Sequence, residues 1–219
     1  MVHDLSIAFG DCTMKHFLAA AFTAALALPA GAETLSPVKT AQLSAALYAT
    51  GIEMGDPLLI LSAAKLRKTL NPKPGSLVAE GAAPVEDAPM GWEEMLAAAE
   101  PWAEGDDVLT ALIEDIRAES TKGVSSGPVY NIGALGNGGN DTYPVVEFVG
   151  GEYAEVYVEA KDATDLNLEV YDAQGRLVCS DTDKSHIAYC GWRPDSTGGF
   201  VMKVANNGPN GANYALMTN

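Results

Sequence analysis

The sequence predicts an α+β protein in two segregated parts, helical hairpins followed by an all-β sandwich or jelly roll. From 33 to 122 the chain is rich in Ala, Leu and Glu, with apolar residues at helical spacing. From 129 to 219 it is rich in Gly, Asn, Asp, Val and Tyr, and apolar and polar residues alternate. The small, polar residues 123–128 between them are typical of a linker. We therefore expect two domains of about 90 residues, each large enough for one modest core.

Residues 1–32 are predicted to be an N-terminal extension and a signal peptide, outside the fold. A short basic stretch follows Met14, residues 17–28 are uninterruptedly apolar or small, and a small-x-small pattern ends at Ala32. The apolar run of about 12 residues is too short for a bilayer core of roughly 30 Å. We expect translation to start at Met14 and cleavage to fall between Ala32 and Glu33. The expected location is the periplasm or the medium, with no transmembrane segment in the mature chain.

The first helices are expected where a capping residue precedes an apolar stripe. Ser36-Pro37 places a cap before a proline at the first helical position, and Asp56-Pro57 repeats this arrangement. Gly51 is expected to end the first helix. A Pro-rich connector, residues 71–89, then separates the second helix from the third.

The same capping pattern recurs before the fourth helix, where Asp106 or Asp107 is the expected cap. Gly55-Asp56 is thus matched by Gly105-Asp106, each lying between an Ala-rich helix and an amphipathic one. Two interpretations remain open, a duplicated helical hairpin and the ordinary capping of unrelated helices. The residues expected on the buried faces are Leu59, Ala63, Leu66 and Leu70, then Trp92, Met95, Leu96 and Ala99, and finally Val108, Leu109, Leu112, Ile113 and Ile116.

Strict alternation marks residues 153–160 as a strand with one apolar and one polar face. Tyr153, Glu155, Tyr157 and Glu159 share the polar face, and Ala154, Val156, Val158 and Ala160 share the other. Turn-rich breaks separate the later strands, which is typical of a sandwich or jelly roll. Those strands are expected at 166–171, 176–180, 187–192, 200–206 and 213–217.

Five short motifs follow one another along this part of the chain. They are the Asp-Leu-x-Leu-x-x-Tyr-Asp strand at 165–172, the turn at Gly175, Leu177-Val178, Thr-Gly-x-Phe at 197–200, and the closing segment 207–216. With them, residues 130–219 resemble the bacterial pre-peptidase C-terminal domain, a secreted β-sandwich often appended to exported peptidases. The resemblance implies a targeting, solubilising or binding module without catalytic residues. The chain departs from the family because about 90 residues of helix, and no peptidase domain, precede this copy.

Cys179 and Cys190 are expected to form one structural disulfide. Cys12 lies in the leader, so these two cysteines form an even pair in an oxidising compartment. His186 is the one histidine after the leader, which leaves too few ligands for a zinc site. The two strands that carry the cysteines are either hairpin partners or members of opposite sheets, in which case the bond pins the sheets together. The cysteine pair is not a general feature of the resembled family.

Charge and motifs argue against several classes of function. The net charge of −16 disfavours nucleic-acid and anionic-membrane partners, which require clustered Lys and Arg. A Ser-His-Asp hydrolase would have to use His186 as its base. The nearest serine, Ser185, is adjacent in sequence, and adjacent side chains rarely project toward a common reacting atom. Glu155 and Glu159 lie about 13 Å apart along one strand, too far for a glycosidase pair. We therefore assign no catalytic residue, although an unrecognised secreted hydrolase using His186 stays open.

The remaining candidates are ligand sites. Oxygen-rich loops at 137–141, 162–167 and 181–183 suit Ca²⁺, but none has the EF-hand pattern, so no metal ligand and no cofactor is assigned. Tyr153, Tyr157 and Tyr171 would form an aromatic platform if they share one sheet face. We expect an exported, non-catalytic protein that binds a protein or carbohydrate of the cell envelope or medium. A calcium-stabilised adhesion or matrix module is the alternative.

Overall fold

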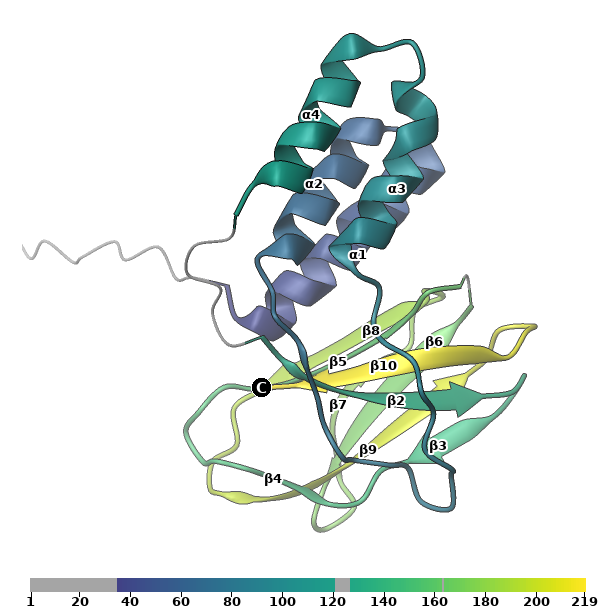
Figure 1. Cartoon of the computed structure of the whole chain (residues 1–219). Coiled ribbons are helices and arrows are strands. Elements are labelled where there is room, and N and C mark those ends of the chain that lie inside the picture. The colour runs from purple at the N-terminus through teal and green to yellow at the C-terminus, as the bar shows by residue number, and fades with distance from the viewer. Residues whose placement is uncertain (1–34, 121–126, 163) are drawn as a thin grey trace, which may run out of the picture. The chain divides into compact units, whose positions relative to one another are not determined.

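A computed structural model describes residues 35–120, 127–162 and 164–219. It confirms the predicted fold class, since four helices precede an all-β sandwich of mostly antiparallel strands (Figure 1). The signal peptide, the cleavage pair Ala32 and Glu33, and most of the linker 123–128 lie outside the described residues. None of the described helices is both long and apolar enough to cross a membrane. The division into two domains stays a prediction.

Three of the four helices begin at the expected caps Ser36, Asp56 and Asp106, and the third begins after Gly91. The helices are α1 (Pro37–Met54), α2 (Pro57–Lys68), α3 (Trp92–Ala103) and α4 (Asp107–Ala118). Ser36 Oγ accepts the backbone N–H of Lys39 at 3.0 Å, which satisfies one unpaired donor of α1. Asp56 and Asp106 cap α2 and α4 in the same way, each accepting a backbone N–H two residues later at 2.9 Å.

The prediction that Gly51 ends the first helix is wrong. α1 continues to Met54 and ends at Gly55, which has the left-handed φ of 64° that glycine tolerates. Gly51 is buried, and a Cβ there would lie 2.7 Å from Ile60 Cγ1. The residue is therefore a close-packing position between α1 and α2, and the sequence alone does not distinguish this role from a helix stop.

The buried helix faces also differ in part from the prediction. In α2 the buried side chains are Ile60, Leu61, Ala63, Ala64 and Arg67, whereas Leu59, Leu66 and Leu70 are half-buried. The expected face of α3 is confirmed, since Met95, Leu96 and Ala99 are buried and Trp92 packs against them. On α4, Ile113 and Ile116 are buried, but Val108 is 70% exposed and Leu112 is 38% exposed.

The sandwich consists of two sheets. The first has the order β1-β2-β10-β5-β8, and the second has the order β3-β9-β6-β7, with β4 paired to another part of β9. Every pairing is antiparallel except β1 with β2, where the Pro-rich connector adds a two-residue parallel strand. The strands are β1 (Lys73–Pro74), β2 (Val129–Leu135), β3 (Asn140–Thr142), β4 (Val146–Phe148), β5 (Ala154–Ala160), β6 (Leu166–Asp172), β7 (Leu177–Asp181), β8 (Ile187–Trp192), β9 (Gly198–Asn206) and β10 (Ala212–Thr218).

The main core lies between the two sheets. Val156 and Val158 of β5 face Leu168 and Val170 of β6 across it, and all four are fully buried. The other face of the first sheet carries a second cluster, in which α1 packs against Tyr157 of β5 and its strand neighbours. The expected polar face of residues 153–160 is therefore buried as well except at Tyr153, with Tyr157 fully buried and Glu155 and Glu159 at 2% and 4% exposure.

The predicted disulfide between Cys179 and Cys190 is present. Cys179 belongs to β7 of the second sheet and Cys190 to β8 of the first, and their Cα atoms lie 5.8 Å apart. The second of the two geometries left open by the sequence therefore holds. The bond links the outermost strands of the two sheets and closes one side of the sandwich.

Candidate functional site

A polar cleft of about 380 Å³ opens at one end of the sandwich, between the β6–β7 turn and the β8–β9 loop. We call it the end cleft. Its floor is apolar, with Trp192 of β8 and Phe200 of β9. Its rim is formed by side chains from the turn (Asp172, Gln174 and Arg176) and from the loop (Arg193, Asp195 and Thr197).

The turn side of the end cleft is organised by Asp172. One carboxylate oxygen accepts the backbone N–H groups of Gln174 and Arg176, both at 2.9 Å, and the other accepts Arg176 Nε at 2.6 Å. The Arg176 backbone N–H, together with its guanidinium, holds the pKa of Asp172 below the ordinary value. Asp172 thus stays ionised and holds the turn and its arginine in place.

The loop side is tied to the turn that follows β4. Thr197 Oγ1 accepts the backbone N–H of Gly150 at 3.0 Å, and the Pro194 carbonyl accepts that of Gly151 at 2.7 Å. Arg193 donates to the Gly151 carbonyl. These bonds place Arg193 and Asp195 at the mouth of the cleft, where both side chains are exposed.

The floor is part of a cluster of three aromatic rings. Trp192 and Phe148 meet edge to face with centroids 4.9 Å apart, and Trp192 and Phe200 lie 5.2 Å apart. The indole Nε1 of Trp192 is buried, and no group in the described parts of the chain accepts its hydrogen bond. A buried donor without a partner is uncommon in folded proteins. The floor therefore rests on packed aromatic rings, one of which carries a buried N–H group without a partner in the described residues.

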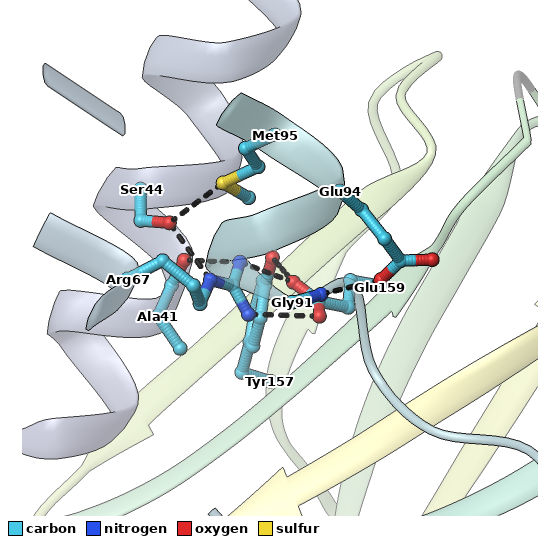
Figure 2. A network of polar contacts seen from close by, with 8 residues as sticks. All are labelled: Ala41, Ser44, Arg67, Gly91, Glu94, Met95, Tyr157 and Glu159. Atoms are coloured by element: carbon cyan, nitrogen blue, oxygen red, sulfur yellow. Dashed lines mark hydrogen bonds and ion pairs between the residues drawn. The ribbon is translucent and has the colours of Figure 1, made fainter. Parts of the chain in front are cut away.

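A second polar assembly lies on the outer face of the first sheet, and Figure 2 shows it. Arg67 of α2 forms a two-bond ion pair with Glu159 of β5, at 3.0 Å and 2.8 Å. The guanidinium also donates to Ser44 Oγ at 2.8 Å and to the Ala41 carbonyl at 3.1 Å, both on α1. Tyr157 OH donates to the same carboxylate at 2.8 Å.

This assembly, which we call the Arg67 network, is closed to solvent. The side chains of Arg67 and Glu159 are each 4% exposed. Burial lowers the pKa of Arg67, but the charge of Glu159 and its hydrogen bonds more than offset this, so the pKa is raised. Burial and the neighbouring Glu159 likewise raise the pKa of Tyr157 well above the ordinary value. The network joins α1 and α2 to β5 of the first sheet.

The groups that a hydrolase would need have other partners among the described residues. His186 is half-buried, and its pKa is lowered by burial, with Glu159 acting in the opposite direction. Ser185 Oγ accepts the backbone N–H of Ile187 at 3.2 Å. Within the described residues no hydrogen bond joins the His186 ring to a serine or an aspartate. Glu155 and Glu159 have separate partners, Tyr189 OH at 2.7 Å for Glu155 and Arg67 for Glu159.

The three tyrosines considered for a platform do not share a surface. Tyr157 is fully buried beneath α1, Tyr153 is 47% exposed, and Tyr171 lies on β6 of the other sheet. Of the acidic loops, burial together with Asp181 and Asp165 raises the pKa of Asp183. No group of three or more His, Cys, Asp or Glu in the described ranges has metal-binding geometry. Calcium binding stays a prediction.

Comparison with known proteins does not establish a family. No family model and no curated protein matches the chain. The pre-peptidase C-terminal domain of a Bacillus anthracis collagenase is 13% identical, covers 42% of this chain and 89% of its own, and has a TM-score of 0.34. PliG of Aeromonas hydrophila, a periplasmic inhibitor of g-type lysozyme, is 13% identical over 42% of this chain and 83% of its own, at a TM-score of 0.31. A carbohydrate-binding module of a Cellvibrio mixtus lichenase, solved with cellotriose, is 11% identical over 39% and 72%, at 0.27.

Proposed function

We propose that this protein is an exported, non-catalytic binding protein that takes a small saccharide in the end cleft. The observation that carries the proposal is the composition of the cleft, an aromatic floor beneath a rim of paired donors and acceptors. A sugar ring has an apolar face that packs on an aromatic side chain and hydroxyl groups that require hydrogen-bond partners. The volume of about 380 Å³ lies at the lower end of ordinary ligand sites and suits one or two rings.

The charge of the rim supports an uncharged ligand. Arg176 and Arg193 supply planar sets of donors, and Asp172 and Asp195 supply acceptors, so the rim has no net charge. This neutrality is local, because the whole chain carries a net charge of −16. Two of its four arginines line this one cleft. Balanced Arg and Asp side chains match vicinal hydroxyl groups, which donate and accept at once.

We further propose that the sandwich belongs to the pre-peptidase C-terminal family and works in the periplasm or the medium. The motifs at 165–178 and 197–216 support the family. The disulfide fits an oxidising compartment, where such bonds persist. The separate partners of Glu155, Glu159 and Ser185 favour binding without bond-making. The partner would be a carbohydrate of the envelope or medium.

Titration calorimetry against a panel of neutral oligosaccharides tests this function. We expect at least one of them to bind, and the double variant Arg193→Ala/Asp195→Ala to weaken that binding about tenfold or more, equivalent to roughly 1.4 kcal/mol. Both side chains are exposed, so we expect the double variant to fold even though Arg193 loses its bond to the Gly151 carbonyl, and a thermal melt checks this. The matched control is Lys203→Ala on the outer face of the second sheet, which should bind as the wild type does. Binding that the double variant leaves unchanged would refute the site, and turnover of the saccharide would refute the non-catalytic role.

A further inference from the structure

An apolar groove of about 750 Å³ runs between α2 and α4. It is lined by residues of the helical part of the chain, whereas the end cleft is lined by residues of the sandwich. Figure 1 shows the two helices side by side. Leu58 and Leu61 of α2 and Leu112 and Ile116 of α4 supply its apolar lining. We call it the α2–α4 groove. It is larger than the end cleft and has little polar lining, so it suits a different kind of ligand.

The apolar stripe of α4 explains why the groove exists. Only part of this stripe is covered by the other helices. Leu109, Ile113 and Ile116 pack into the helical core, whereas Val108 and Leu112 lie outside it. Val108 is 70% exposed and Leu112 is 38% exposed, and Leu58 on the opposite wall is 55% exposed. An amphipathic helix with two of the five residues of its apolar stripe exposed has a surface that favours a further apolar partner.

The edges of the groove are acidic. Asp115 and Glu119 lie on the α4 side, and Lys65 on the α2 side is paired with Glu119 at 3.1 Å. The other nearby cations are directed elsewhere. Arg117 pairs with Glu100 and Glu114, and Lys68 donates to backbone carbonyls at the end of α4. Among the described residues no cation pairs with Asp115, which leaves an uncompensated negative charge beside the apolar lining.

We propose that the α2–α4 groove docks the apolar face of a basic amphipathic helix from a partner protein. The lining of the groove runs from Leu58 to Lys65 and from Leu112 to Glu119. Each stretch spans about 10 Å, or two helical turns, which matches anchors at i, i+4 and i+7 of an incoming helix. A lysine or arginine flanking those anchors meets Asp115, whereas Glu119 is already paired with Lys65. A second copy of this chain is a less favourable occupant, because it carries the same net charge of −16 and would be repelled.

A synthetic peptide tests the proposal with the whole protein. The probe is a labelled helix of about 15 residues, the length at which isolated helices become stable in water, with leucines at i, i+4 and i+7 and lysines between them. One control peptide has the same composition with scattered leucines, and another has glutamate in place of lysine. We expect fluorescence anisotropy at about 0.15 M salt to show tighter binding of the probe than of either control.

Variants assign that binding to the groove. Leu58→Ser/Leu112→Ser should weaken binding of the probe about tenfold or more, and Asp115→Lys should weaken it while improving binding of the glutamate peptide. Val149→Ser, an apolar residue of the sandwich that is 52% exposed, is the matched control and should change nothing. Equal binding of the scattered peptide, or unchanged binding by the leucine variants, would overturn the proposal. So would self-association of the wild type that the leucine variants abolish, because a second copy would then occupy the groove.

Discussion

The two faces of β5 are both buried, but by different means. The inner face presents Val156 and Val158 to the opposite sheet, and simple apolar packing covers it. The outer face presents Tyr157 and Glu159, which are covered by α1 and matched by Arg67 of α2. An alternating strand thus specifies which residues share a face. It does not specify which face meets water, because a helix that supplies a counter-charge can bury the polar one.

The largest expected effect comes from breaking the Arg67 network. Arg67→Met leaves Glu159 charged and buried without its partner, which should lower the free energy of unfolding by about 3–5 kcal/mol. The double variant Arg67→Met/Glu159→Leu should recover most of this loss, because replacing both charges with apolar groups is nearly neutral. Urea denaturation measures both.

The exposed pair Arg117 and Glu100 gives the matched control for that experiment. Their side chains are 45% and 52% exposed, so Arg117→Met should cost less than about 1 kcal/mol. If Arg67→Met costs no more than Arg117→Met, the outer face of β5 is not held by the buried ion pair. The comparison between the two faces would then fail.

The next effect concerns the edge of the sandwich, where Cys179 and Cys190 connect the two sheets. Cys179→Ser/Cys190→Ser should lower the free energy of unfolding by roughly 2–3 kcal/mol, since the bond closes a short loop in the unfolded chain. Thermal melting with and without reductant measures it. If full reduction leaves the melting temperature of the wild type unchanged, the inner core alone holds the two sheets together.

Alkaline pH should weaken the protein through its buried tyrosines. Burial raises the pKa of Tyr143 to about 12, above the ordinary value of 10.0, although its hydrogen bond with Tyr214 opposes this. Because the folded-state pKa is the higher one, the unfolded chain releases this proton first, and stability is lost as pH rises from about 10 to 12. Denaturation midpoints across this range should fall more steeply for the wild type than for Tyr143→Phe. If the midpoints of the two proteins fall equally with rising pH, burial does not raise the pKa of Tyr143.

Two changes should have the smallest effects. His186→Ala should leave saccharide binding unchanged, because the ring lies outside the end cleft.

Chelator should leave the melting temperature unchanged, since no described cluster has metal-binding geometry. A melting temperature that rises with added Ca²⁺ would instead support the calcium-stabilised module, because a ligand that binds only the folded state must stabilise it.

Local chemistry predicted much of the fold. Ser36, Asp56 and Asp106 were identifiable as caps because each precedes an apolar stripe, and all three cap helices. The alternation of residues 153–160 predicted the two face sets of β5 correctly. The strands β1 to β4 were not predicted. β1, β3 and β4 have only two or three residues each, and all four pair with strands that are distant in sequence.

The candidate site was harder to predict than the fold. The end cleft combines turn residues at 172–176 with loop residues at 193–197, and only the β-sandwich brings them together. One signal for the Arg67 network was present in the sequence, an arginine within the stripe Ile60, Ala63 and Ala64. Its partner Glu159 lies 92 residues away, so no local pattern connects the two.

Mapping amide chemical shifts by NMR during titration with the tightest saccharide of the panel tests whether the end cleft is the binding surface of this protein. The perturbed amides should lie in the β6–β7 turn and in residues 192–200 of the β8–β9 region. Perturbations confined to other surfaces of the sandwich, or to the helices, would contradict it.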